Sequence, residues 1–409
     1  MNLKDIEKLV TIDVENDAKF LHLTPNENVL SESAKKFLGS TISTRYNFGP
    51  AYNNEAFTLY AGFTSLAKKG VHELVGQTES AINERLGSSH VLFAPLSGLH
   101  AMMMAVLSTT QPGDTVYCLD QEYGGHFATM GMCQSTGRHV KTIPFNKTTL
   151  DVDYAALQSA TAQETNNYIV YIDASYSLIP FDLTRIKQII GSNILIYDAS
   201  HTFGLILGGA FPNPLNEGAD IISANTHKTL PGSHKGILVF GDSTLFAEVD
   251  QRAHVFYSST HTDHLIALCV TIHEMLHYGT DYAHAVVRNA NLLGDLLQAN
   301  GLACRRADSK QWSHTHQLHL PTGNLGNVES LAKCLFDSNI AVSFDNMFEQ
   351  GPFIRFGLQE VTRRGITEKQ LESLAKAIAD CLKSNKNVGE LIESILTSLN
   401  KVGYSFDAA

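Results

Sequence analysis

Short apolar segments alternate with amphipathic segments through the middle of the chain. The apolar segments are rich in Val, Ile, Leu and Tyr, and they lie at residues 91–96, 115–120, 167–175, 194–200, 219–227 and 236–242. Between them, apolar residues recur at three- and four-residue spacings, as in GHFATMGMCQST and DLTRIKQII, which indicates helices. Buried strands that alternate with helices are typical of a mostly parallel, doubly wound sheet. We therefore predict an α/β fold for this part of the chain.

The two ends of the chain have different patterns. A helical pattern covers about the first 20 residues, and long helical patterns begin near Asp263 and lead into a smaller segment with both strand and helix patterns. We expect an N-terminal helix and arm over 1–30, a large α/β domain over 31–265, and a linking helix with a small C-terminal α+β domain over 266–409.

Composition and charge exclude several classes of protein. The 409 residues are 44% hydrophobic and 17% charged, which excludes a disordered chain. The net charge of −11 excludes nucleic acid as a partner, because phosphate binding requires clustered Lys and Arg. No apolar run reaches the roughly 18–20 residues that cross a membrane, and the N-terminus lacks the basic-then-apolar order of a signal peptide. The six cysteines form no CxxC pair, and we expect small core residues in a reducing, cytoplasmic compartment.

Four polar features follow the predicted strands. They are the Ser97-Gly98 turn, the GGH sequence that ends at His126, Asp198 in YDASH and Lys228 in THKT. Each has an ordinary structural explanation: a helix cap, a packed core histidine, a second cap and a solvated surface lysine. Together they would supply a phosphate-binding turn, a ring-stacking imidazole, an anion for a ring nitrogen and a Schiff-base amine. This combination specifies pyridoxal 5'-phosphate.

The stretches that contain these residues resemble the serine hydroxymethyltransferase family. The strongest are PLSGLHA, QPGDTVYCLDQEYGGH, YDASHTFGLILGGAFPNPLNEGAD, THKTLPG and FIRFGLQEVTRRG, and the resemblance extends from about Leu23 to Cys381. It implies a fold-type-I pyridoxal-phosphate enzyme with a large domain and a smaller C-terminal domain. It also implies a small amino acid as substrate and a homodimer with shared active sites.

The resemblance assigns roles to individual residues. Lys228 would carry the cofactor, Asp198 would pair with its ring nitrogen, and His126 would stack on its ring. Arg355 would bind the substrate carboxylate, which a bidentate guanidinium suits, and Tyr60 would be a catalytic tyrosine. The further implied cofactor contacts are Ser97, Gly98, Ser175, His201, Thr226, His227 and Thr262. The implied substrate contacts are Asn26, Glu27, Tyr46, Tyr60 and Arg355. No metal ligand is predicted.

One departure from the family pattern changes the expected reaction. The family's Tyr-x-Glu-Gly motif becomes Tyr46-Asn47-Phe48-Gly49, so Phe48 replaces a glutamate that carries a proton in the folate-dependent step. A phenyl ring cannot carry a proton. We therefore expect folate-independent cleavage or formation of a Cα–Cβ bond, as in an aldolase or transaldolase that acts on glycine or a β-hydroxy amino acid together with an aldehyde.

Four alternatives remain open. Folate-dependent hydroxymethyl transfer could persist if Glu55 or a water molecule replaced the missing glutamate. Racemisation, transamination or condensation would use the same cofactor. The chain could also be an inactive binder of the cofactor. Finally, His273-Glu274-Met275-Leu276-His277 matches the HExxH zinc motif, although a polar stripe on a helix explains this short sequence more simply.

Overall fold

The computed structural model describes residues 1–408 and divides into two compact units. The large unit contains Asn28–His284 and the segment from Tyr404 onward, and the small unit contains Met1–Glu27 and Ala285–Gly403. The division falls between His284 and Ala285, inside the long helix α10 (Thr262–Ala299), whereas the boundary expected from the sequence, after residue 265, lies in the first turn of this helix. The N-terminal arm joins the C-terminal residues because β1 (Leu21–His22) pairs in parallel with β14 (Ile340–Ala341).

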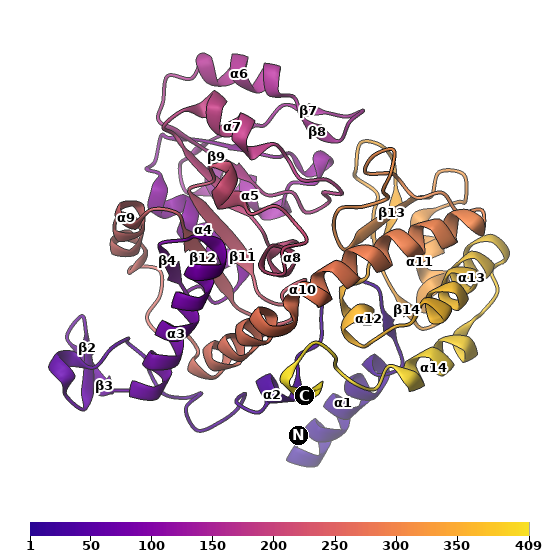
Figure 1. The fold of residues 1–409 in the computed structure, drawn as a ribbon, viewed down its shortest axis with the longest axis horizontal. Helices are drawn as coiled ribbons and strands as arrows, with labels where there is room; N and C mark the ends of the chain where they lie inside the picture. Colours follow the sequence, from indigo (N-terminus) through magenta and orange to yellow (C-terminus); the bar gives the residue numbers. More distant parts are fainter. Residues whose placement is uncertain (409) are drawn as a thin grey trace. The chain divides into compact units, whose positions relative to one another are not determined.

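A seven-stranded sheet forms the centre of the large unit (Figure 1). Its strands in spatial order are β4 (His90–Leu92), β12 (Gly236–Phe240), β11 (Ile221–Asn225), β10 (Ile194–Asp198), β9 (Tyr168–Ile172), β5 (Thr115–Cys118) and β6 (His139–Thr142). Among these seven strands, β12 runs in the opposite direction to the other six. The α/β prediction is confirmed, and the six apolar segments found in the sequence overlap β4, β5, β9, β10, β11 and β12.

Helices connect the strands and cover the sheet (Figure 1). They are α3 (Lys69–Leu86), α4 (Gly98–Thr109), α5 (Phe127–Ser135), α6 (Tyr154–Ala162), α7 (Leu183–Ile190), α8 (Phe203–Leu207) and α9 (Ser243–Ala253). The side chains that follow the strands start several of them, since Ser97, Asp153 and Asp182 each accept a backbone N–H in the first turn. The apolar face of α4 is buried in one core cluster with residues of β9, β10, β11 and β12, which fixes its first turn at the end of the sheet.

The large unit also contains short elements outside this sheet. They are α2 (Glu32–Lys35), η1 (Tyr52–Asn54), β2 (Phe57–Tyr60), β3 (Phe63–Leu66), η2 (Gln121–Tyr123), β7 (Phe145–Asn146), β8 (Asp151–Val152), η3 (Pro214–Glu217) and η4 (Phe406–Ala408). The strands β2 and β3 form an antiparallel hairpin.

Helix α10 is continuous through Gly279. This glycine lies where the end of α8 meets α10: a Cβ added at Gly208 would collide with the Gly279 carbonyl oxygen and the Ala283 side chain. Small residues therefore allow the two helices to approach closely at this point. None of the described helices is long and apolar enough to cross a membrane.

The small unit is built around an antiparallel sheet in the order β13 (Gln317–Pro321), β16 (Phe353–Gly357), β15 (Ser343–Asp345). Its helices are α1 (Leu3–Asp17), α11 (Val328–Phe336), α12 (Gln359–Arg363), α13 (Glu368–Ser384) and α14 (Gly389–Ser398). Strand and helix side chains share one apolar core.

The interpretation of all six cysteines as reduced core residues is wrong for one pair. Cys334 on α11 and Cys381 on α13 form a disulfide, with their Cα atoms 6.4 Å apart. The two cysteines are 47 residues apart in the sequence and meet only because α11 packs against α13, so their spacing gave no sign of the pairing. Cys118, Cys133, Cys269 and Cys304 are buried and free, as expected.

Candidate active site

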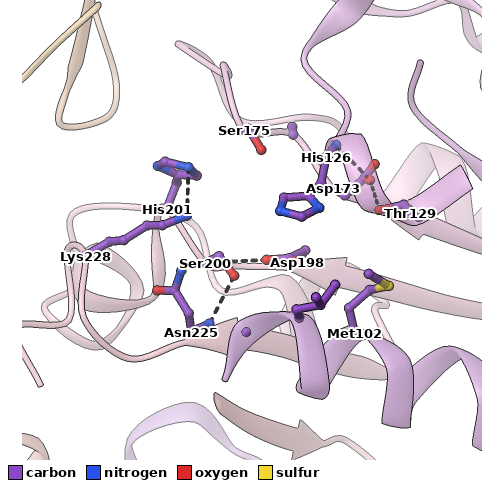
Figure 2. Close-up of a pocket in the computed structure, with 13 residues that line it drawn as sticks. Met102, His126, Thr129, Asp173, Ser175, Asp198, Ser200, His201, Asn225 and Lys228 are labelled. Carbon is purple, nitrogen blue, oxygen red and sulfur yellow. Dashed lines mark hydrogen bonds between the residues drawn. The ribbon is translucent and has the colours of Figure 1, made fainter. Parts of the chain in front are cut away.

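A hollow opens at the carboxyl ends of β9, β10 and β11 in the large unit (Figure 2). Its lining includes six of the residues that the sequence analysis singled out: Gly98, His126, Ser175, Asp198, His201 and Lys228. Figure 2 shows Lys228 and His201 on one side of the hollow and His126 on the other. Ligands of parallel α/β sheets bind at this end of the strands, so the fold explains why these residues meet.

Lys228 is held from both its backbone and its side chain. Its Nζ lies 3.1 Å from Nε2 of His201. Its carbonyl oxygen accepts a hydrogen bond of 2.6 Å from the Asn28 amide. The loop that carries it is tied to the His201 backbone as well, since the Thr229 hydroxyl donates to the His201 carbonyl oxygen at 3.0 Å. The amine is thus presented at a defined position.

Asp198 ends β10, and both of its carboxylate oxygens accept hydrogen bonds. The Ser200 N–H donates to Oδ1 at 2.8 Å, and the Tyr171 hydroxyl donates to Oδ2 at 2.6 Å. These two donors fix the orientation of the carboxylate. An anion fixed in this way can hold a ring nitrogen in its protonated form.

His126 begins α5, and its Nδ1 accepts the Ala128 N–H at 3.3 Å. Burial lowers the pKa of this imidazole, although the Asp198 carboxylate opposes the shift. The turn before it requires glycine, because a Cβ at Gly125 would collide with the Leu119 carbonyl oxygen. A neutral, flat ring therefore forms one wall of the hollow.

The Asp173 carboxylate holds the turn at His126 through hydrogen bonds. Its carboxylate accepts hydrogen bonds from the His126 N–H at 3.1 Å, the Thr129 hydroxyl at 2.7 Å and the Leu119 N–H at 3.3 Å. Burial raises the pKa of Asp173 to about 7 in spite of these donors. The role of Asp173 was not predicted from the sequence, although the position of this residue directly after a buried strand was a usable signal.

The first turn of α4 forms another wall. The Ser97 hydroxyl accepts the His100 N–H at 3.1 Å, so it acts as the helix cap. A Cβ at Gly98 would lie 2.7 Å from Cβ of Asn225, so only glycine lets this turn approach the end of β11. The N–H groups of a first helical turn have no partner within the helix, and they favour an anion such as a phosphate.

These groups fit pyridoxal 5'-phosphate. The hollow offers an amine, an anchored carboxylate, a flat imidazole and a helix N-terminus. It is also lined by Asn225, whose buried side-chain oxygen has no hydrogen-bond partner in the protein. Asn225 was not singled out from the sequence, although it is a polar residue at the end of a buried strand and three residues before Lys228.

The loop that carries Lys228 is stabilised by contacts of Thr226 and His227. The Thr226 hydroxyl lies 2.5 and 2.9 Å from the carbonyl oxygens of Ser233 and Lys235, and it closes the loop. The His227 ring stacks on His234 with centroids 3.7 Å apart. Burial, helped by His234 and Lys228, lowers the pKa of His227 to about 3, so its ring is neutral. Their cofactor contacts stay a prediction.

The region of Phe48 lies elsewhere in the large unit. The ring centroids of Tyr46, Phe48, Tyr60 and His254 follow one another at 5.0, 5.4 and 5.7 Å. Phe48 and Tyr60 border a second hollow, whose lining among the described residues contains neither Lys228 nor any Asp or Glu.

Two further residues considered in the sequence lie outside both hollows. Glu55 is exposed. Thr262 is buried at the start of α10, and its hydroxyl lies 3.4 Å from the Arg45 carbonyl oxygen. The roles of Tyr46, Tyr60 and Thr262 stay predictions.

Arg355 and its neighbours belong to the small unit. Nη2 of the buried Arg355 donates to the Asn26 side-chain oxygen at 3.0 Å, and the Asn26 amide lies 3.3 Å from the Ser343 hydroxyl. Glu27 instead faces His22, with Oε2 3.6 Å from Nδ1. Asn26 thus orients the guanidinium. Substrate contacts by Asn26, Glu27 and Arg355 stay predictions.

The HExxH sequence on α10 makes structural contacts. The buried Glu274 carboxylate accepts the Phe406 N–H at 3.1 Å, and the His277 ring meets the Phe406 ring edge-on at 5.5 Å. His273 Nε2 lies 3.2 Å from the Thr78 hydroxyl. Two of the three side chains therefore hold the segment from Tyr404 to Ala408 against α10.

Comparison with known proteins agrees with this geometry. The family model described as serine hydroxymethyltransferase matches residues 2–378. The chain belongs to the serine hydroxymethyltransferase family. The family prediction is confirmed, and the chain is a pyridoxal-phosphate enzyme of the serine hydroxymethyltransferase-like group. Its fold is the fold-type-I α/β fold expected from the sequence.

Transaldolases are among the most similar members of the family. The chain is 35% identical over 396 residues to the fluorothreonine transaldolase of Streptantibioticus cattleyicolor, covering 93% of this chain and 60% of that protein. It is 32% identical over 383 residues to an L-threonine:uridine-5'-aldehyde transaldolase of a Streptomyces species, covering 91% and 90%. The crystal structure of an L-threonine transaldolase from Pseudomonas fluorescens superposes with a TM-score of 0.90 at 30% identity, covering 99% of this chain and 94% of that one.

Proposed function

We propose that this enzyme is a transaldolase that works without folate. It would cleave the Cα–Cβ bond of a β-hydroxy-α-amino acid such as L-threonine and join the remaining glycine unit to a second aldehyde. The observation that carries this proposal is Phe48. By the resemblance to the family it stands where the family has a proton-carrying glutamate, and its ring lies within an aromatic stack. The relatives named for transaldolase reactions on threonine support the same conclusion.

The residues of the hollow suit this chemistry. When bound, pyridoxal phosphate supplies an electron sink for the bonds at Cα. Lys228 supplies the amine that holds the cofactor covalently, and His201 at 3.1 Å can take a proton from that amine. Asp198 keeps the ring nitrogen protonated, and His126 holds the ring flat. The family resemblance assigns the carboxylate of the amino acid to Arg355 of the small unit, and the hydrogen bond to Asn26 orients its guanidinium.

We also infer a homodimer in which each chain completes the site of its partner. Tyr46, Tyr60 and the loop 259–262 are the residues that would cross. Tyr60 and Thr260 border a hollow that does not include Lys228 of the same chain, which supports a role on another copy.

The first test is the absorbance spectrum of the cofactor-loaded protein. Lys228→Ala should lose the band of the Lys228–cofactor adduct, whereas Lys333→Ala, a change to an exposed lysine on α11, should keep it. With L-threonine and an added aldehyde, the wild-type protein should release acetaldehyde and form a new β-hydroxy amino acid without tetrahydrofolate. Serine cleavage that requires tetrahydrofolate, with no reaction on threonine, would overturn the proposal in favour of hydroxymethyl transfer.

A further inference from the structure

Tyr171 is a buried tyrosine whose hydroxyl donates a hydrogen bond to a carboxylate of the active site and also contacts the Ser223 side chain. It lies on β9, inside the apolar sequence Tyr168–Ile172, and its side chain is fully buried. Strand β10 runs parallel beside it, with Tyr171 opposite Ile196, so the phenol reaches Asp198 at the end of β10. The 2.6 Å distance from the Tyr171 oxygen to Oδ2 is typical of a strong hydrogen bond to a charged acceptor.

The direction of this bond is fixed. An ionised carboxylate only accepts, so Tyr171 donates. Burial raises the pKa of Tyr171 well above its usual value of 10.0, and the nearby Asp198 and Asp173 carboxylates raise it further. The phenol therefore keeps its proton at neutral pH. Because packing alone would be satisfied by Phe, the hydroxyl calls for another explanation, and its bond to Asp198 provides one.

We propose that Tyr171 is a positioning residue that aligns the Asp198 carboxylate and makes it a weaker base, so that the cofactor's ring nitrogen keeps its proton. This inference depends on the role of Asp198 in the proposed function. The Ser200 N–H on Oδ1 and the Tyr171 hydroxyl on Oδ2 leave the carboxylate one orientation. A carboxylate that already accepts a strong hydrogen bond competes less well for the proton that it shares with the ring.

The test is Tyr171→Phe, which removes one oxygen atom and keeps the packing volume. The apoprotein is titrated with pyridoxal phosphate, and the spectrum of the loaded protein is then recorded against pH without any substrate. Hydrogen bonds to charged groups change equilibria by about ten- to a hundredfold, so we expect cofactor affinity to fall by about tenfold or more. The pH midpoint of the spectrum should rise, because the adduct nitrogen takes a proton more easily once the ring has lost its positive charge.

Tyr117→Phe is the matched control. Tyr117 is equally buried on the neighbouring strand β5, but its hydroxyl lies 3.3 Å from the Ala160 carbonyl oxygen and 3.3 Å from a Glu164 carboxylate oxygen. It should lose thermal stability without a change in cofactor affinity or pH midpoint. The effect of Tyr171→Phe should also vanish in an Asp198→Asn background, because the hydrogen bond would then have lost its charged acceptor.

Two results would overturn the inference. One is a Tyr171→Phe protein whose affinity and midpoint match wild type while its melting temperature falls as in Tyr117→Phe, which would indicate packing alone. The other is an unchanged effect in the Asp198→Asn background. Failure of the proposed function is distinguishable, because it would appear as a wild-type protein that loads cofactor normally but does not exchange aldehydes on threonine.

Discussion

At the scale of single residues, the active-site groups are positioned by neighbours before any ligand binds. Lys228 is a clear example, since the Asn28 amide holds its carbonyl oxygen while the His201 ring meets its amine. Asn28 also donates to the Tyr282 hydroxyl at 2.9 Å, so the loop that carries the lysine is connected to α10. An amine on a constrained loop loses less conformational freedom when it becomes covalently attached.

His22 should make the stability of the protein depend on pH. A hydrogen bond to Glu27 raises the pKa of His22 from 6.5 to about 8, with burial opposing and Glu360 and Asp17 assisting. A raised pKa means that the folded chain holds this proton more tightly than the unfolded chain. The contribution is therefore fully present below pH 6.5 and is lost as the pH rises through about 8; it amounts to at most about 2 kcal/mol.

Urea unfolding at about pH 6 and about pH 9 measures this contribution. His22→Gln should remove up to about 2 kcal/mol of the decline that wild type shows between the two pH values. A decline of the same size in both proteins would show that other groups are responsible.

Active-site residues that lie inside a recognisable motif could be predicted from the sequence. Residues whose contacts depend on the pairing of two strands could not. Prediction was possible for Lys228, Asp198 and His126, because each lies in a short stretch that resembles the sequence of the serine hydroxymethyltransferase family. Tyr171 and Asn225 could not be predicted, because their roles depend on which strand lies beside which. The sequence around Tyr171 predicts only an apolar position in a buried strand. The pairing of β9 with β10 brings its hydroxyl to Asp198.

At the scale of elements, the order of strands and helices was predictable and their ends were less so. The apolar run 91–96 was predicted as a strand, but β4 ends at Leu92. β4 lies at the edge of the sheet and pairs with β12 through Leu92, Val91 and His90, after which the chain turns toward α4. Apolar character continues beyond the last pair because Phe93 and Ala94 remain buried without being paired. Burial and pairing are separate properties, and periodicity reports only burial.

Two glycine substitutions should have opposite effects on stability. Gly208→Ala places a methyl group against Ala283 and the Gly279 carbonyl oxygen, where α8 meets α10. Overpacking of this kind costs about 1–3 kcal/mol. Gly76→Ala lies inside α3 with no atom near the added methyl group, and it should stabilise the protein by about 0.5–1 kcal/mol.

Thermal unfolding of the two variants beside wild type tests this difference. The two melting temperatures should move in opposite directions from the wild-type value. A Gly208→Ala protein as stable as wild type would mean that the two helices separate at little cost.

At the scale of the whole molecule, the hairpin of β2 and β3 exposes apolar side chains that suit a subunit contact. Phe63 and Leu66 are 68% and 74% exposed, and Leu59 on the paired strand is 44% exposed. An apolar cluster of this kind on a surface usually marks an interaction site. The same hairpin carries Tyr60, which the proposed dimer would bring to the partner's active site.

Phe63→Asp should therefore shift the protein from dimer to monomer and lower transaldolase activity with it. Light scattering coupled to size-exclusion chromatography measures the mass directly. Leu391→Asp, which changes a half-exposed leucine on α14, is the control and should leave the mass unchanged. A Phe63→Asp protein of unchanged mass would exclude the hairpin as an essential contact.

The division of the chain into two units has a consequence for its synthesis. Each unit is assembled from two separated segments: Met1–Glu27 belongs with Ala285–Gly403, and Asn28–His284 belongs with the segment that starts at Tyr404. On the ribosome, β1 must wait for about 320 residues before its partner strand β14 emerges. The large unit can form its sheet early, but it gains the contacts of Phe406 with Glu274 only after residue 406 has left the exit tunnel. Nascent chains halted before and after this point should therefore differ in resistance to protease.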